Sequence, residues 1–236
     1  MHPYEAFDGA TNFGGKRIDD FTQSSYVWKT VAGEGVGGGA CITLCTLWAK
    51  NDFTPTLGGR KAFLQDVKDH QDSRDNIATT QHKLTGSTIG AQRSMQNDML
   101  REVGLAPSSQ VSQVLWANYK DRGEFGDEEA KKKKFLQDAA QSILHGDTHG
   151  YRLITIENNP APHHALAARY FGEELEFFDP NGGVIRFDNP QDLSPWFSEY
   201  YVPNCYERVY GFRIRYFVPS PSTTTTTFFW PPSARN

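Results

Sequence analysis

The sequence has little cysteine, no excess of basic residues and no long apolar run. Three cysteines in 236 residues exclude a dense disulfide scaffold, and their odd number leaves at least one thiol free unless it pairs between chains. A formal net charge of -4 provides no general positive field, so nucleic acid is not an expected partner. Because no run of about 18 apolar residues exists, the sequence predicts no transmembrane segment. The free thiol is therefore the feature that most clearly points to chemical reactivity.

The two ends of the chain differ from the middle. The first twenty residues lack the basic start and apolar run of a secretory signal peptide, so a secreted protein would leave its cell by another route or within a longer chain. From residue 219 the sequence PSPSTTTTTFFWPPSARN is rich in Pro, Ser and Thr, a composition that buries little apolar surface. We expect one domain over residues 1–218 and a tail or linker over residues 219–236.

The apolar periodicity predicts helices first and strands second. A mostly apolar helix begins near Cys41, amphipathic helical patterns fill residues 59–103, and a further helix spans residues 127–146. After residue 150 come YRLITIE, HHALAARYF, ELEFFD and GVIRF, separated by short turns, and then GFRIRYFV. Strands joined by so few residues are antiparallel neighbours. The sequence therefore predicts an α+β domain with an antiparallel sheet.

The glycine-rich segment before the apolar helix has two interpretations. Gly33, Gly35 and Gly38 match the GxGxxG pattern of dinucleotide-binding loops. However, no second strand ending in an acidic residue follows about 20 positions later, which favours a plain loop. The loop would deliver Cys41 to a helix N-terminus, where free N–H groups and the helix dipole stabilise a thiolate. Cys41 is a candidate nucleophile, and its alternative role is a small apolar core residue.

The other two cysteines have weaker patterns. Cys45 lies one turn after Cys41, inside the helix, where a cysteine usually serves as an apolar core residue. The C-x3-C pair lacks the second pair of cysteines or histidines that a zinc site requires. Cys205 matches no motif, so neither it nor Cys45 is a candidate for catalysis.

A histidine and an aspartate lie at the ends of two strands that we expect to pair. The turn at Gly172 would bring His164, at the start of the first strand, near Asp179, at the end of the second. A carboxylate can then hold one imidazole nitrogen and leave the other to accept a thiol proton. His163 would point to the opposite face. The alternative for Asp179 is an aspartate that only initiates the turn.

The blocks GGACITLCTLW and HALAARYF…FFDPNGG resemble the YopT/AvrPphB-type papain-like cysteine proteases of bacterial effectors. In that family a cysteine opens a helix, a histidine begins a strand and an aspartate lies in a DPN-G turn. Here 123 residues separate Cys41 from His164 and 15 separate His164 from Asp179. The resemblance implies a nucleophile helix and a helical lobe packed on an antiparallel β-sheet, with Cys41, His164 and Asp179 as the catalytic triad.

One departure from the papain-like pattern concerns the oxyanion hole. Papain-like enzymes often place Gln or Asn five or six residues before the cysteine, and here those positions are Val36 and Gly35. Losing one oxyanion donor typically costs about 100- to 1,000-fold in rate. Gln23 is the nearest upstream amide, and we take it as the oxyanion candidate. The alternatives are a donor from elsewhere in the chain that works with the Cys41 backbone N–H, and a site that does less than full acyl-transfer chemistry.

The resemblance implies acyl transfer through a thioester, with no metal and no organic cofactor. It implies a cysteine protease that cleaves a host protein, as a virulence effector or toxin domain secreted or translocated into the host cell cytosol. The same triad could instead make the protein a glutamine deamidase or transglutaminase. A third alternative is a catalytically silent module that binds a partner through Lys131–Lys134 or residues 210–218, although the lysines follow acidic residues and resemble a solvated helix face. The oligomeric state is left open.

Overall fold

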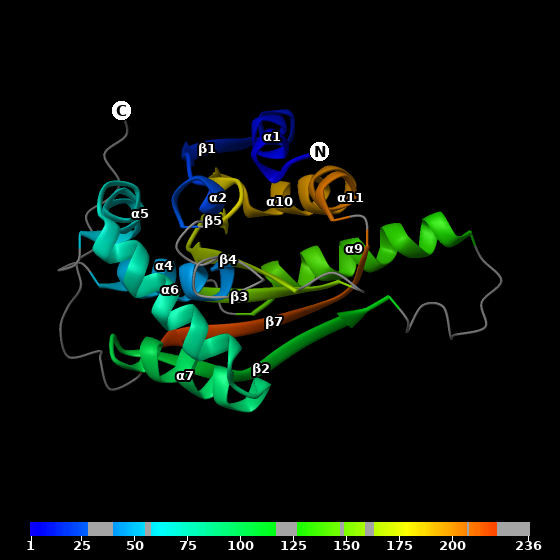
Figure 1. The fold of residues 1–236 in the computed structure, drawn as a ribbon. Helices are drawn as coiled ribbons and strands as arrows, with labels where there is room; N and C mark the ends of the chain where they lie inside the picture. The colour runs from blue at the N-terminus through cyan, green and yellow to red at the C-terminus, as the bar shows by residue number, and fades with distance from the viewer. Residues whose placement is uncertain are drawn as a thin grey trace.

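The protein folds around one antiparallel sheet that carries helices on both faces, as a computed structural model shows (Figure 1). The structure describes residues 1–27, 40–54, 58–116, 127–146, 149–158, 163–206 and 208–220. The glycine-rich GxGxxG segment and residues 221–236 of the expected tail lie outside this part of the chain. The predicted α+β class with an antiparallel sheet is confirmed.

The sheet contains seven strands within the described residues, in the order β1-β6-β5-β4-β3-β7-β2. Every neighbouring pair is antiparallel. The strands are β1 (Gly15–Asp19), β2 (Leu105–Leu115), β3 (His149–Asn158), β4 (His164–Phe171), β5 (Glu174–Asp179), β6 (Gly183–Phe187) and β7 (Val209–Pro219). The five runs that the sequence indicates after residue 150 are β3 to β7.

The helices divide into two groups, one on each face of the sheet (Figure 1). The first group comprises α4 (Cys41–Phe53), α5 (Gly59–Asp69), α6 (Gln71–Thr85) and α7 (Ile89–Arg101). The second comprises α1 (Pro3–Asp8), α9 (Glu128–Leu144), α10 (Leu193–Pro195), the π-helical segment η4 (Trp196–Tyr201) and α11 (Val202–Cys205). Three short elements, α2 (Gln23–Tyr26) and the 3-10 turns η1 (Gly9–Phe13) and η3 (Pro190–Asp192), complete the described chain. None of the described helices is long and apolar enough to cross a membrane.

Strand alternation gives each helical group its own apolar core. Ile154, Leu166 and Phe177 face the α9 and η4 side, whereas Leu153, Ala167 and Phe178 face the α4 side. Because both faces are buried, the central strands read as nearly continuous apolar runs.

Helix α4 is buried between the sheet and the α5–α7 lobe. It begins at Cys41, as the sequence predicts, and it is apolar on most sides. Trp48 is fully buried and stacks on Phe178 of β5, with ring centroids 5.4 Å apart. This packing fixes the helix against the strand that ends in Asp179, and it determines where the start of α4 lies.

Candidate active site

Cys41 is the first residue of α4 and is 2% exposed. The first N–H groups of an α-helix have no partner within the helix. Two buried glutamines satisfy N–H groups around Cys41: Gln23 Oε1 accepts from the Ala40 N–H at 2.8 Å, and Gln81 Oε1 accepts from the Thr43 N–H at 3.1 Å. Cys41 therefore lies at the positive end of the helix dipole, where a thiolate is stabilised.

The β4–β5 hairpin brings His164 to Asp179. Ala167 pairs with Phe178, so the next step of the register places Leu166 opposite Asp179 and makes His164 a diagonal neighbour on the same face. His164 Nε2 lies 2.8 Å from Asp179 Oδ1. Because Nε2 donates to this carboxylate, Nδ1 is the nitrogen left for the Cys41 side chain, which helps raise the pKa of His164.

The turn after Asp179 is fixed by its glycines. The Gly182 N–H donates to the Asp179 carbonyl at 2.9 Å. Gly183 has a φ of +102°, and a Cβ there would lie 2.3 Å from the Asp19 carbonyl oxygen. Only glycine fits this left-handed position beside the β1 backbone. The DPNGG sequence therefore holds Asp179 at the end of β5.

The Asp179 carboxylate is fully buried and accepts four hydrogen bonds. Oδ1 accepts from His164 and from the Asn181 N–H at 2.8 Å, whereas Oδ2 accepts from the hydroxyls of Tyr201 at 2.6 Å and Tyr206 at 2.9 Å. A buried carboxylate is tolerated when its lone pairs are satisfied and a positive partner is close.

His164 and Asp179 form an ion pair. Burial alone would lower the pKa of His164, but the charge of Asp179 and the hydrogen bonds to Asp179 and Cys41 outweigh burial and raise it to about 10. Burial also opposes ionisation of Asp179, and the imidazolium with the Tyr201 and Asn181 hydrogen bonds lowers the pKa of Asp179 below its usual value. At neutral pH the site therefore contains an imidazolium beside Cys41.

The remaining cysteines and the neighbouring histidine lack these surroundings. Burial, with the charges of Cys41 and Asp179, raises the pKa of Cys45 well above its usual value. Burial and Asp179 also raise the pKa of Cys205 to about 12. His163 is exposed. Within the described residues, no group of three or more His, Cys, Asp or Glu side chains could hold a metal ion.

Gln23 links the start of α4 to the turn that carries Asp179. Its backbone N–H donates to the Pro180 carbonyl at 2.6 Å, and its Nε2 donates to Asn181 Oδ1 at 2.8 Å. The Ala40 N–H can only donate, so it fixes Oε1 toward α4 and leaves the Nε2 group on the other side of the amide. Hydrogen bonds thus connect Ala40, Gln23, Asn181, Asp179 and His164. Val36 and Gly35, the usual amide positions, lie outside the described residues.

Sequence reasoning missed three groups that contact Asp179. Asn181 belongs to the quoted DPN turn, and its position two residues after an aspartate could have indicated a backbone donor. Tyr201 and Tyr206 lie in the segment YYVPNCY, where no spacing pattern distinguishes them from other aromatic core residues.

Residues 8–208 match the family model Peptidase_C58, described as "Yersinia/Haemophilus virulence surface antigen". The chain belongs to this family of cysteine proteases. The match covers most of the chain, and it confirms the resemblance drawn from the two sequence blocks. The chain is accordingly a domain of a cysteine protease family.

This C58 protease is similar to one named relative and to two solved structures. "Protein adenylyltransferase and cysteine protease IbpA" from Histophilus somni is 26% identical over 198 residues, which are 78% of this chain and 4% of IbpA. The chain thus spans a small part of that relative. The crystal structure of the Pseudomonas avirulence protein AvrPphB has a TM-score of 0.50 and 14% identity, over 75% of this chain and 90% of AvrPphB. The YopT domain of the Pasteurella multocida PfhB2 toxin has a TM-score of 0.32 and 21% identity, over 83% of this chain and 89% of that domain. The likeness to AvrPphB supports the papain-like fold.

Proposed function

We propose that Cys41, His164 and Asp179 form the catalytic triad with which this C58 protease cleaves a host protein. The observation that supports this most directly is the hydrogen bond at 2.8 Å between His164 Nε2 and Asp179 Oδ1, with Cys41 close enough to help raise the pKa of His164. The nucleophile, the group that carries the proton and the carboxylate that orients it are then arranged in the order that acyl transfer requires.

The reaction proceeds in two acyl-transfer steps. The Cys41 thiolate attacks the carbonyl carbon of the scissile peptide, and the His164 imidazolium gives its Nδ1 proton to the leaving amine as the C–N bond breaks. A thioester joins Cys41 to the acyl half of the substrate. Water then attacks the thioester while His164 accepts its proton, and the carboxylate product leaves with the thiolate restored. Asp179 stays ionised and keeps the imidazole in one orientation.

Gln23 is the second oxyanion donor in this proposal, together with the Cys41 backbone N–H. Its Nε2 group has two protons, and Asn181 accepts one of them. The Gln23→Ala variant is expected to lower kcat by about 100- to 1,000-fold, the usual effect of losing one oxyanion donor. The measurement is steady-state cleavage of a peptide substrate.

Gln81→Ala is the matched control, because Gln81 also offers a buried Oε1 to an N–H group at the start of α4. It removes the hydrogen bonds that the backbone N–H and hydroxyl of Thr43 donate to Gln81, so we expect reduced stability with kcat nearly unchanged. Equal losses of kcat in both variants would assign the Gln23 effect to helix capping and contradict the oxyanion role.

The substrate and the setting of the domain are also proposals. The family description names a virulence surface antigen, and the IbpA relative joins a cysteine protease to an adenylyltransferase. These names support a virulence effector or toxin domain that is secreted or translocated into a host cell, where reducing conditions suit a free thiol. We keep residues 1–218 as the catalytic domain and residues 219–236 as a tail or linker.

The lysine run does not favour the silent-module alternative. Lys133 lies 2.9 Å from Glu199 and Lys134 lies 2.6 Å from Asp138, and both lysines are largely exposed. Ion pairs of this kind are typical of a solvated helix face. The charges of this part of α9 are therefore partly balanced by acidic neighbours.

Wild type added to a lysate of eukaryotic cells is expected to produce protein fragments with new N-termini. The Cys41→Ala variant should produce none, because the attacking sulfur is gone. Cys45→Ala, which removes the same group one helical turn deeper, should still cleave. Mass spectrometry of intact proteins and of new N-termini provides the measurement. Mass increases of about one dalton at glutamine without fragments would overturn the protease mechanism in favour of deamidation.

A further inference from the structure

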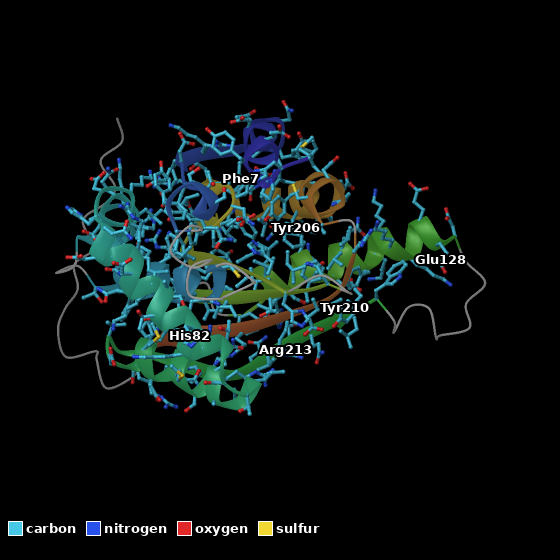
Figure 2. All side chains as sticks on the ribbon, in the orientation of Figure 1. Phe7, His82, Glu128, Tyr206, Tyr210 and Arg213 are labelled. Carbon is cyan, nitrogen blue, oxygen red and sulfur yellow. The ribbon has the colours of Figure 1, made fainter. Side chains whose placement is uncertain are left out.

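Tyr206 contacts both members of the His164–Asp179 pair. Its ring stacks on the imidazole, with centroids 5.4 Å apart and an interplanar angle of 20°. Its hydroxyl donates to Asp179 Oδ2 at 2.9 Å. Figure 2 shows Tyr206 between the α10–α11 segment and the sheet. One side chain therefore restrains the plane of the imidazole and also the carboxylate that holds Nε2.

Tyr201 supplies the other donor to the same oxygen. Its hydroxyl lies 2.6 Å from Asp179 Oδ2, and the side chain is fully buried. It is the last residue of the π-helical segment η4, and its ring stacks on Trp196 with centroids 4.6 Å apart. π-Helical turns are rare and often occur at functional sites. Trp196 and the rest of the aromatic core hold the Tyr201 hydroxyl in place.

The two tyrosines bind one of the two oxygens of the Asp179 carboxylate and leave the other to different partners. Oδ2 is taken by two hydroxyl donors, and Oδ1 is left for His164 and the Asn181 N–H. With both oxygens engaged, Asp179 cannot rotate without breaking hydrogen bonds inside a buried site. A buried tyrosine hydroxyl needs a hydrogen-bond partner, and here both hydroxyls share the same carboxylate oxygen.

We propose that Tyr206 is a positioning residue that holds the His164 imidazole in register with Cys41, and that Tyr201 supports it by fixing Asp179. The inference rests on the proposed triad. It predicts that the ring and the hydroxyl of Tyr206 have separable effects. The ring limits rotation of the imidazole, whereas the hydroxyl stabilises the ionised carboxylate.

The charged and titratable neighbours of Asp179 come from several elements. They come from β4, α4, η4, α11 and the residue after α11, and each acts by charge or by a hydrogen bond on Asp179 or on His164. They are His164, Cys41, Cys45, Tyr201, Cys205 and Tyr206.

The test measures alkylation of Cys41 by iodoacetamide as a function of pH, in the full chain, by mass spectrometry of the labelled peptide. Tyr206→Leu removes ring and hydroxyl, and we expect alkylation at pH 6 to slow by about 10- to 100-fold, as for loss of a hydrogen bond to a charged group. Tyr206→Phe keeps the ring, so its rate should lie between those of wild type and Tyr206→Leu. In Tyr201→Phe/Tyr206→Phe the Asp179 carboxylate has lost both hydroxyl donors and is protonated more easily. A protonated Asp179 no longer holds the His164 imidazolium beside Cys41, so the pH at which alkylation of Cys41 begins should rise.

Tyr200→Phe is the matched control, since Tyr200 adjoins Tyr201 but packs against Phe13. It should alkylate like wild type. Wild-type rates and an unchanged pH profile in all Tyr201 and Tyr206 variants would overturn the positioning role. Tyr206→Phe keeps the packing, so it decides the question even where Tyr206→Leu fails to fold. His164→Ala is measured in parallel: an undiminished rate there would refute the triad itself, whereas a slow rate there with normal tyrosine variants would refute only the positioning role.

Discussion

Replacing His164 by alanine is expected to slow cleavage of a protein substrate by roughly 10⁴- to 10⁶-fold, the range found when a member of a catalytic triad is removed. The imidazolium is the counter-charge of the Cys41 thiolate and the proton donor for the leaving amine. Its pKa of about 10 keeps it charged throughout the neutral range. Without it, Asp179 remains as a buried negative charge near the thiol and opposes thiolate formation. Turnover of a cleaved peptide is the measurement.

The control for this variant is the adjacent residue. His163 is exposed, so His163→Ala changes the same residue type beside the site without touching Asp179, and it should retain wild-type turnover. At pH 6, iodoacetamide should modify Cys41 of wild type far faster than Cys45 and Cys205, the two thiols whose pKa is raised. This selectivity should disappear in His164→Ala. Equal modification of the three cysteines in wild type would contradict an activated Cys41.

The juxtaposition of His164 and Asp179 could be predicted because it is a local property of one hairpin. The turn at Gly172 and the two-residue period of the strands determine the register, and the register determines which side chains are diagonal neighbours. The start of α4 at Cys41 could also be predicted from nearby residues, because a glycine-rich segment precedes an apolar helix there. These parts of the fold depend on residues close together in the sequence.

The surroundings of the His164–Asp179 pair depend on contacts between distant parts of the chain, which no local sequence pattern predicts. Tyr201 and Tyr206 reach Asp179 from 22 and 27 residues away, through a π-helical segment with no simple periodicity. Gln23 could be named only as the nearest upstream amide, since its place is set by hydrogen bonds to Ala40 and Asn181. Strands β1 and β2 were not predicted, because an edge strand has one neighbour and weaker alternation.

A buried group of charges fixes the other end of α4 to the sheet. Asp52 near the end of α4 and Glu176 of β5 are 3% and 0% exposed. Arg60 of α5 contacts both carboxylates. Arg169 Nε lies 2.8 Å from Asp52 Oδ2, and the Arg186 terminal nitrogen lies 3.0 Å from Glu176 Oε1. Since α4 begins with Cys41 and β5 ends with Asp179, this cluster joins the two elements that carry the proposed nucleophile and the orienting acid.

The Glu176→Gln variant is expected to lower the free energy of unfolding by about 3–5 kcal/mol, because it leaves one buried and two partly buried guanidinium groups with one carboxylate fewer. For a chain of this size, this corresponds to a fall of roughly 6–20 °C in the melting temperature. The shape of the side chain is kept, so the loss measures charge pairing and not a cavity.

Glu173→Gln is the matched control, because Glu173 is exposed at the turn of the same hairpin and should change stability by less than about 0.5 kcal/mol. Urea unfolding of both variants provides the measurement. If Glu176→Gln were as stable as Glu173→Gln, the attraction within the cluster would only balance its desolvation, and the aromatic packing of Trp48 on Phe178 would have to hold α4 against β5 by itself.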